Sequence, residues 1–123
     1  MAEAVQRALQ VEVEKYRGIQ KDYQKLVASR QQLDSQLSEN QAVKAELDLL
    51  EDSGNVFKLI GPVLVKQELQ EARHNVEKRI EYISGELKRT DKTLEDVESK
   101  QDAQREVVAK LQQQLQMKAG GKA

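Results

Sequence analysis

The feature that most constrains this chain is a short apolar segment in the middle of a long polar sequence. Residues 56–65 read VFKLIGPVLV, and they contain the only Pro and the only Phe of the 123 residues. β-branched and aromatic residues on both sides of a Gly-Pro break are typical of two strands joined by a turn. The segment therefore predicts a β-hairpin, although Gly-Pro is not a usual two-residue hairpin loop and leaves the turn type open.

Both faces of this hairpin are expected to be largely apolar. Side chains alternate along a strand, so Val56, Lys58 and Ile60 share one face, and Phe57 and Leu59 share the other. An isolated two-stranded hairpin is marginally stable in water, and its open apolar edges promote aggregation. We therefore expect the hairpin to pair with hairpins of other subunits in a shared sheet or barrel. The alternative is that it folds back onto the helices of its own chain.

The sequence on either side of this segment predicts two long helices. Only 3% of the residues are aromatic and 33% are charged, which is typical of a coiled coil rather than of a globular core. Apolar residues recur at the first and fourth positions of a heptad through both arms. We call these repeat positions the seam. In the first arm the seam is Ala2, Val5, Leu9, Glu12, Tyr16, Ile19, Tyr23, Leu26, Arg30, Leu33, Leu37, Asn40, Lys44 and Leu47. In the second arm it is Leu69, Arg73, Val76, Ile80, Ile83, Leu87, Thr90, Leu94, Val97, Gln101, Gln104, Val108, Leu111, Leu115 and Lys118.

The simplest topology folds the two arms back against each other in antiparallel directions. In the register that pairs Leu33 with Leu87, every seam position of one arm meets a seam position of the other. The same register pairs Arg30 with Thr90, so the most polar layer is polar on both sides. Such polar layers can fix a register at some cost in stability.

The seam layers are not expected to be equally stable. Half-polar layers flank the hairpin and recur toward the free ends of the arms, so we expect the middle of the coiled coil to be its firmest part. Near the hairpin these layers are Leu47–Arg73, Lys44–Val76 and Asn40–Ile80, and toward the free ends they are Glu12–Val108, Tyr16–Gln104 and Ile19–Gln101. Free ends that lie beyond weak layers are expected to open locally at low cost.

The predicted organisation is a single domain over residues 1–123. The first helix covers 1–51, a turn and the hairpin cover 52–66, the second helix covers 67–118, and a frayed tail covers 119–123. The cluster of turn-forming residues from Asp52 to Asn55 ends the first helix. The fold class is mainly α: a long antiparallel two-helix coiled coil whose central β-hairpin joins an oligomeric β-barrel.

The sequence carries no pattern typical of an enzyme. It has no Gly-rich phosphate loop and no Cys, and His74 is its only His, so we expect no catalytic residue, no cofactor and no metal site. The many carboxylates alternate with Lys and Arg, which is typical of a solvated face. The net charge of −1 gives no reason to expect nucleic acid or a membrane surface as a partner. Without a signal peptide or a long apolar run, a cytoplasmic location is expected, and a nuclear one stays open.

Two stretches of the sequence resemble a known family. Residues 55–83, NVFKLIGPVLVKQELQEARHNVEKRIEYI, are similar to the hairpin and second helix of β-type prefoldin subunits. Residues 30–47, RQQLDSQLSENQAVKAEL, resemble the eukaryotic subunit-six branch of that family. The resemblance implies a heterohexamer with two α-type and three further β-type subunits, joined through hairpins in a double β-barrel. It also implies an ATP-independent holdase that passes unfolded chains, such as actin and tubulin, to the cytosolic chaperonin.

The resemblance also implies two sets of site residues. Subunit assembly is assigned to Val56, Phe57, Leu59, Ile60, Val63, Leu64 and Val65. Client binding at the coiled-coil tips is assigned to Val5, Leu9, Val108, Leu111 and Leu115. The half-polar layers next to that end suggest that local opening exposes seam leucines to clients. The alternative is a structural coiled-coil scaffold or adaptor subunit in a prefoldin-like nuclear complex.

Overall fold

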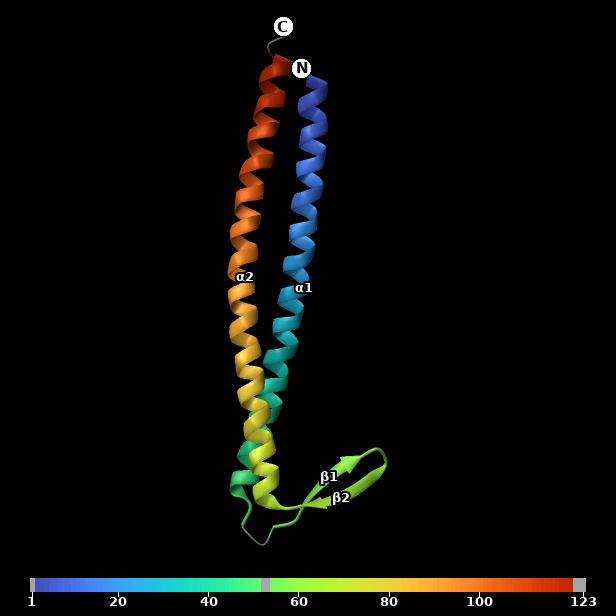
Figure 1. Cartoon of the computed structure of the whole chain (residues 1–123), viewed down its shortest axis with the longest axis vertical. Coiled ribbons are helices and arrows are strands. Elements are labelled where there is room, and N and C mark those ends of the chain that lie inside the picture. The colour runs from blue at the N-terminus through green and yellow to red at the C-terminus, as the bar shows by residue number, and fades with distance from the viewer. Residues whose placement is uncertain (1, 52–53, 121–123) are drawn as a thin grey trace. The chain divides into compact units, whose positions relative to one another are not determined.

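The chain folds into two long helices with a hairpin between them, which confirms the helices and the hairpin of the predicted fold class. A computed structural model describes residues 2–51 and 54–120. The elements are α1 (Ala2–Leu49), β1 (Val56–Ile60), β2 (Val63–Gln67) and α2 (Leu69–Gly120) (Figure 1). Compared with the prediction, the first helix ends two residues earlier, and the second begins and ends two residues later. Asp52 and Ser53 of the predicted turn, and residues 121–123 of the predicted tail, lie outside the described residues.

The structure consists of two units, each containing a piece of both helices. Unit 1 comprises residues 1–29 and 90–123, and unit 2 comprises residues 30–89 with the hairpin. Within each unit the two helical pieces lie side by side and run in opposite directions (Figure 1). Every seam residue of α1 from Ala2 to Leu47, and of α2 from Leu69 to Leu115, is buried or half-buried. The heptad pattern therefore identified the packed faces of both helices.

The best-buried part of unit 2 lies where the helices meet the hairpin. Leu47, Leu69, Ala72 and Val76 form a buried cluster there, and each is between 5% and 7% exposed. The expectation that the layers next to the hairpin are weak is therefore wrong. Arg73, the predicted seam partner of Leu47, is not part of this apolar cluster. Ala72, the residue beside it in the sequence, packs there instead.

The polar side chain of that layer, Arg73, caps the end of α1. Its Nη2 donates to the carbonyl oxygens of Leu47 at 2.9 Å and of Leu50 at 3.1 Å, and its Nε donates to Leu47 O at 3.3 Å. The last carbonyl groups of a helix have no partner within the helix, and a basic side chain near them is favourable. The last turn of α1 has no basic residue of its own, so α2 supplies the cation.

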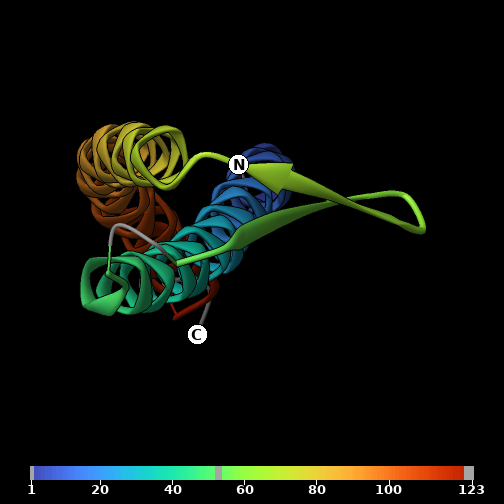
Figure 2. The ribbon, with the colours of Figure 1, turned by 90° about the horizontal axis from the view of Figure 1, so that it is seen from below.

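The hairpin is closed by a two-residue loop. The antiparallel pairing runs from Val56 opposite Gln67 to Ile60 opposite Val63, which leaves only Gly61 and Pro62 in the turn. Gly61 has φ +58°, a left-handed value that favours glycine, and the proline ring fixes φ near −65°. This order of signs is that of a type II′ turn, whose twist suits a hairpin. Seen along the helices, the hairpin extends away from the helix ends of its own unit (Figure 2).

Candidate functional site: two protein-interaction surfaces

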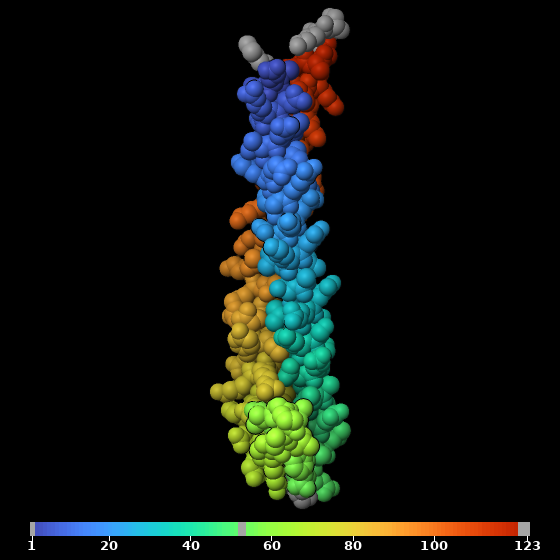
Figure 3. All heavy atoms as spheres, turned by 90° about the vertical axis from the view of Figure 1, so that its right-hand side faces the viewer, coloured from blue at the N-terminus to red at the C-terminus, as the bar shows by residue number. Residues whose placement is uncertain are grey.

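The hairpin is an exposed apolar surface. Of the seven residues predicted to carry assembly, six are between 44% and 68% exposed: Phe57, Leu59, Ile60, Val63, Leu64 and Val65. In the space-filling view the hairpin stands in front of the helices of unit 2 as a separate group of light-green atoms (Figure 3). An exposed apolar patch of this kind marks a protein-interaction site or an aggregation hazard.

The strand register divides these side chains between two faces. Residues directly opposite each other share a face, so Leu59, Leu64, Phe57 and Lys66 form what we call the outer face. Ile60, Val63, Val65, Lys58, Val56 and Gln67 form the inner face, which turns toward the helices at its Val56–Gln67 end. Both faces carry large exposed apolar side chains, as the alternation in the sequence predicted.

Val56 differs from the other six predicted assembly residues. Its side chain is half-buried and packs against the buried cluster of Leu47, Leu69, Ala72 and Val76. The alternative in which the hairpin folds back onto its own helices therefore holds at this one position. Val56 anchors the base of the hairpin, and the strands beyond it project free of the helices.

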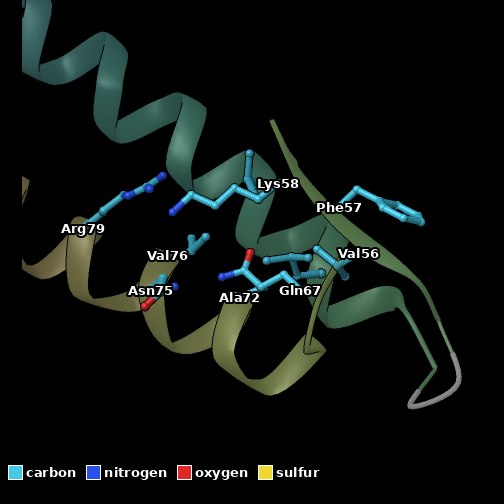
Figure 4. A pocket seen from close by; sticks show the side chains of 10 residues that line it. Val56, Phe57, Lys58, Gln67, Ala72, Asn75, Val76 and Arg79 are labelled. Carbon is cyan, nitrogen blue, oxygen red and sulfur yellow. The ribbon is translucent and has the colours of Figure 1, made fainter. Parts of the chain in front are cut away.

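Between the inner face and the helices lies an open groove that the sequence did not reveal. We call it the hairpin groove; its volume is about 190 Å³. Its lining combines apolar residues with two amides and two cations: Val43, Leu47, Val56, Phe57, Ala72, Val76, Gln67, Asn75, Lys58 and Arg79. In Figure 4 the side chains of Lys58 and Arg79 run toward each other, whereas the Phe57 ring points away from the helices. No sequence pattern signals this groove, because its residues come from four separate elements, α1, β1, β2 and α2.

The second set of predicted site residues lies in the seam of unit 1. Val5 is buried, and Leu9, Val108, Leu111 and Leu115 are half-buried between the two helical pieces. Val5 is the only buried apolar residue among the described residues of this unit, whereas unit 2 has six. The seam of unit 1 is therefore less completely buried than the seam of unit 2.

The half-polar layers of unit 1 contain hydrogen bonds between the helices. Gln104 Nε2 donates to the backbone oxygen of Glu12 at 2.9 Å and to its carboxylate at 2.5 Å. Arg105 donates to the Tyr16 hydroxyl at 3.2 Å, with its guanidinium 5.9 Å from the ring centre. These contacts satisfy polar groups that the seam pattern alone would leave without partners.

A further hydrogen bond, from Tyr23 to Glu98, joins the helices of unit 1. This bond and the one from Arg105 shift the pKa values of Tyr23 and Tyr16. The Tyr23 hydroxyl donates to Glu98 at 3.0 Å, and this raises the pKa of Tyr23 because a carboxylate stabilises the protonated phenol. The pKa of Tyr16 is lowered, mainly because Arg105 donates to its hydroxyl. Both tyrosines therefore act as packing residues with a polar contact across the seam.

Acid is expected to weaken unit 1 partly through Glu12. The pKa of Glu12 lies below its ordinary value of 4.5, chiefly because Gln104 donates to its carboxylate and secondly because Lys15 is close; partial burial opposes both. A carboxylate whose pKa is lowered in the folded state stabilises the fold at any pH above its ordinary pKa. That stabilisation is lost as the pH falls through the folded-state pKa. The melting temperature of Glu12→Gln, followed by circular dichroism from about pH 6 to about pH 3, should therefore fall less than that of the native chain.

The matched control is Glu95→Gln, which removes an exposed carboxylate of the same unit. Glu95 forms no ion pair or hydrogen bond among the described residues. This variant should keep the acid dependence of the native chain. Equal acid dependence of all three proteins would show that the Glu12–Gln104 contact does not stabilise unit 1.

The part of the chain that the structure describes contains neither a metal-binding group nor a membrane-spanning helix. No group of three or more His, Asp or Glu side chains there could hold a metal ion, and His74 is an exposed residue of α2. Over residues 2–51 and 54–120, neither helix has a stretch apolar enough, at the length required, to span a membrane.

Comparison with known proteins agrees with this geometry. The model of the family described as "Prefoldin subunit" matches residues 10–115. Prefoldin subunit 6 of Homo sapiens is 54% identical over 123 residues, which is 100% of this chain and 95% of the relative. Prefoldin subunit 6 of Arabidopsis thaliana is 55% identical over 119 residues, covering 97% of this chain and 92% of the relative.

A solved structure has the same fold. The crystal structure of the prefoldin beta subunit from Thermococcus strain KS-1 superposes with a TM-score of 0.76 at 21% identity. The match covers 88% of this chain and 92% of that chain. The family match over most of the chain and the full-length identity lead to one conclusion: this chain belongs to the prefoldin subunit family and is similar along its whole length to prefoldin subunit 6.

Proposed function

We propose that this chain is a β-type subunit of hexameric prefoldin and that it acts in an ATP-independent holdase. Family membership supports a place in the prefoldin co-chaperone complex, with other prefoldin subunits as partners. It also agrees with the expectation that the chain is not an enzyme. The observation that carries the proposal is the hairpin, whose outer and inner faces both expose large apolar side chains.

The proposed role of the hairpin is assembly. An exposed hairpin has unpaired backbone groups along both edges, and pairing with further strands satisfies them while burying the apolar faces. In the proposed hexamer, two α-type and three further β-type subunits supply those strands, and the hairpins close into a double β-barrel. Six exposed assembly residues are available for this purpose in the chain alone.

The proposed client site is the seam of unit 1. Its half-buried leucines lie on helical pieces held together by exposed polar bonds, so separating them costs less than separating the buried seam of unit 2. Separated helices would offer Leu9, Leu111 and Leu115 to unfolded polypeptides. Clients of the actin and tubulin type, delivery to the cytosolic chaperonin and a cytoplasmic location are parts of this proposal.

The proposal is tested with a reconstituted hexamer and a chemically unfolded protein. Light scattering without ATP should show that the hexamer suppresses aggregation of the unfolded protein. Gln101→Leu replaces a half-buried polar seam residue by an apolar one and keeps the Gln104 bonds to Glu12, so it should stiffen unit 1 and reduce the suppression. If the stiffened hexamer captures clients as well as the native one, local opening is not the mechanism.

A second candidate function is a structural scaffold subunit in a prefoldin-like nuclear complex. The observation that favours it is the set of bonds across the seam of unit 1, because Gln104, Arg105 and Tyr23 each tie one helix to the other. A scaffold would form the hexamer yet leave the aggregation of an unfolded protein unchanged. The same light-scattering measurement therefore separates the two functions.

A further inference from the structure

We propose that the hairpin groove of unit 2 receives a carboxylate-bearing segment of a neighbouring prefoldin subunit. The inference rests on the proposed function, because it assumes that the hairpin is covered by other subunits. It adds a second contact surface to the exposed strands and states the chemistry of the partner. Lys58 and Arg79 make the mouth of the groove cationic, and its floor is apolar. A segment with an Asp or Glu beside apolar side chains would complement both.

The charge of the groove comes from Lys58 and Arg79. Their side chains run toward each other (Figure 4), and the groove lining contains no carboxylate. Within residues 2–51 and 54–120, neither of the two cations forms an ion pair. Glu68 and Glu71 line the neighbouring hollow with Lys58, but among the described residues neither forms an ion pair with it. Two cations at a groove whose own lining holds no acid attract a carboxylate, and arginine binds one through two parallel hydrogen bonds.

The floor of the groove is apolar and partly open. Val56 and Val76 belong to the packed base of the hairpin, whereas Val43 is still 44% exposed at the edge. The space open to the centre of a water-sized sphere is about 190 Å³, many times the roughly 10–15 Å³ that one water molecule needs on the same measure. The groove therefore has room for apolar side chains that flank the carboxylate.

Continuity with the assembly surface favours a neighbouring subunit as the occupant. Lys58 of β1 and Gln67 of β2 lie on the inner face and also line the groove, so a subunit that pairs with β1 or β2 also reaches the groove mouth. Covering the hairpin removes water from Lys58, and a desolvated ammonium group is costly unless an acid accompanies it. A carboxylate from the covering subunit meets that requirement.

The occupant can be identified by zero-length cross-linking of the reconstituted hexamer. A carbodiimide joins a lysine amine to a carboxylate in direct contact, and Arg79→Lys adds a second amine at the mouth. Mass spectrometry of the digested hexamer should link residue 58 or 79 to an Asp or Glu of another prefoldin subunit. Links only to Glu68 or Glu71, which line the neighbouring hollow with Lys58, would overturn the proposal. Links only to a second copy of this chain or to a client would also overturn it.

Charge reversal gives an independent test. Lys58→Glu combined with Arg79→Glu should lower the yield of hexamer on native mass spectrometry by about tenfold or more, because like charges would meet at the interface. The matched control is Lys78→Glu with Lys88→Glu, which makes the same change in net charge at two exposed lysines of α2 outside the groove lining. It should assemble like the native chain.

The outcomes separate this inference from the function beneath it. Circular dichroism should show the same helix content for both double variants and the native chain. If the native chain and the groove variant assemble equally well, the groove inference fails and the assembly role stands. If the native chain itself does not enter a hexamer, the proposed function fails.

Discussion

Replacing Leu59 and Leu64 with aspartate is expected to abolish assembly while leaving the helices intact. The two leucines lie opposite each other on the outer face, and they are 68% and 66% exposed in the chain alone. Burying two such side chains contributes about 3–6 kcal/mol, and aspartate adds a desolvation cost. The association constant should therefore fall at least about a hundredfold. Native mass spectrometry after co-expression with the other subunits should find the variant as a free chain.

The matched control for this variant is Tyr82→Asp. Tyr82 is 66% exposed on α2 of the same unit but lies outside the hairpin. The Tyr82→Asp variant removes a large side chain that is as exposed as Leu59 and Leu64. It therefore tests whether losing any large exposed side chain of unit 2 weakens assembly. Hexamers that form normally with the Leu59 and Leu64 double variant would rule out the outer face as an assembly surface.

The largest effect on the stability of the chain itself is expected from Leu47→Ala. Leu47 is 7% exposed within the cluster that joins α1, α2 and the base of the hairpin. Truncating a buried leucine to alanine typically costs about 2–5 kcal/mol, because the apolar contacts are lost and a cavity remains. Urea unfolding followed by circular dichroism should show a loss of this size. Hydrogen exchange should also show faster exchange in β1, since Val56 packs on the same cluster.

Leu49→Ala provides the internal control two residues further along. Leu49 is the last residue of α1 and is 85% exposed, so its truncation should change the free energy of unfolding by less than about 0.5 kcal/mol. Equal losses from the two variants would contradict the assignment, because they would show that burial of Leu47 in the cluster is not what stabilises this end of unit 2.

The periodicity of the sequence predicted the architecture because burial in a two-helix structure follows the heptad closely. The seam residues are the ones that the structure buries, and Leu87 and Ile83, assigned to layers with Leu33 and Leu37, are among the best buried. The hairpin was also predictable, since Gly61-Pro62 interrupts two short β-branched runs. The turn type followed only from the positive φ of Gly61.

What the sequence could not predict depends on side chains that leave the repeat. Arg73 occupies a seam position, so its layer was expected to be weak, yet its guanidinium turns to the end of α1 while Ala72 fills the apolar contact. Val56 was expected to serve assembly, but its side chain packs on helices from both arms. The groove between Lys58 and Arg79 depends on the angle of the hairpin, which no periodic pattern encodes.

The cap that Arg73 places on α1 has a consequence for how the chain unfolds. The final carbonyl groups of α1 are satisfied by a side chain from the second turn of α2, across the intervening hairpin. Fraying of the start of α2 therefore exposes the end of α1, and fraying of the end of α1 leaves the Arg73 cation without its acceptors. The two helix ends should consequently melt in a single cooperative step, together with the hairpin base, whose Val56 packs on the same cluster.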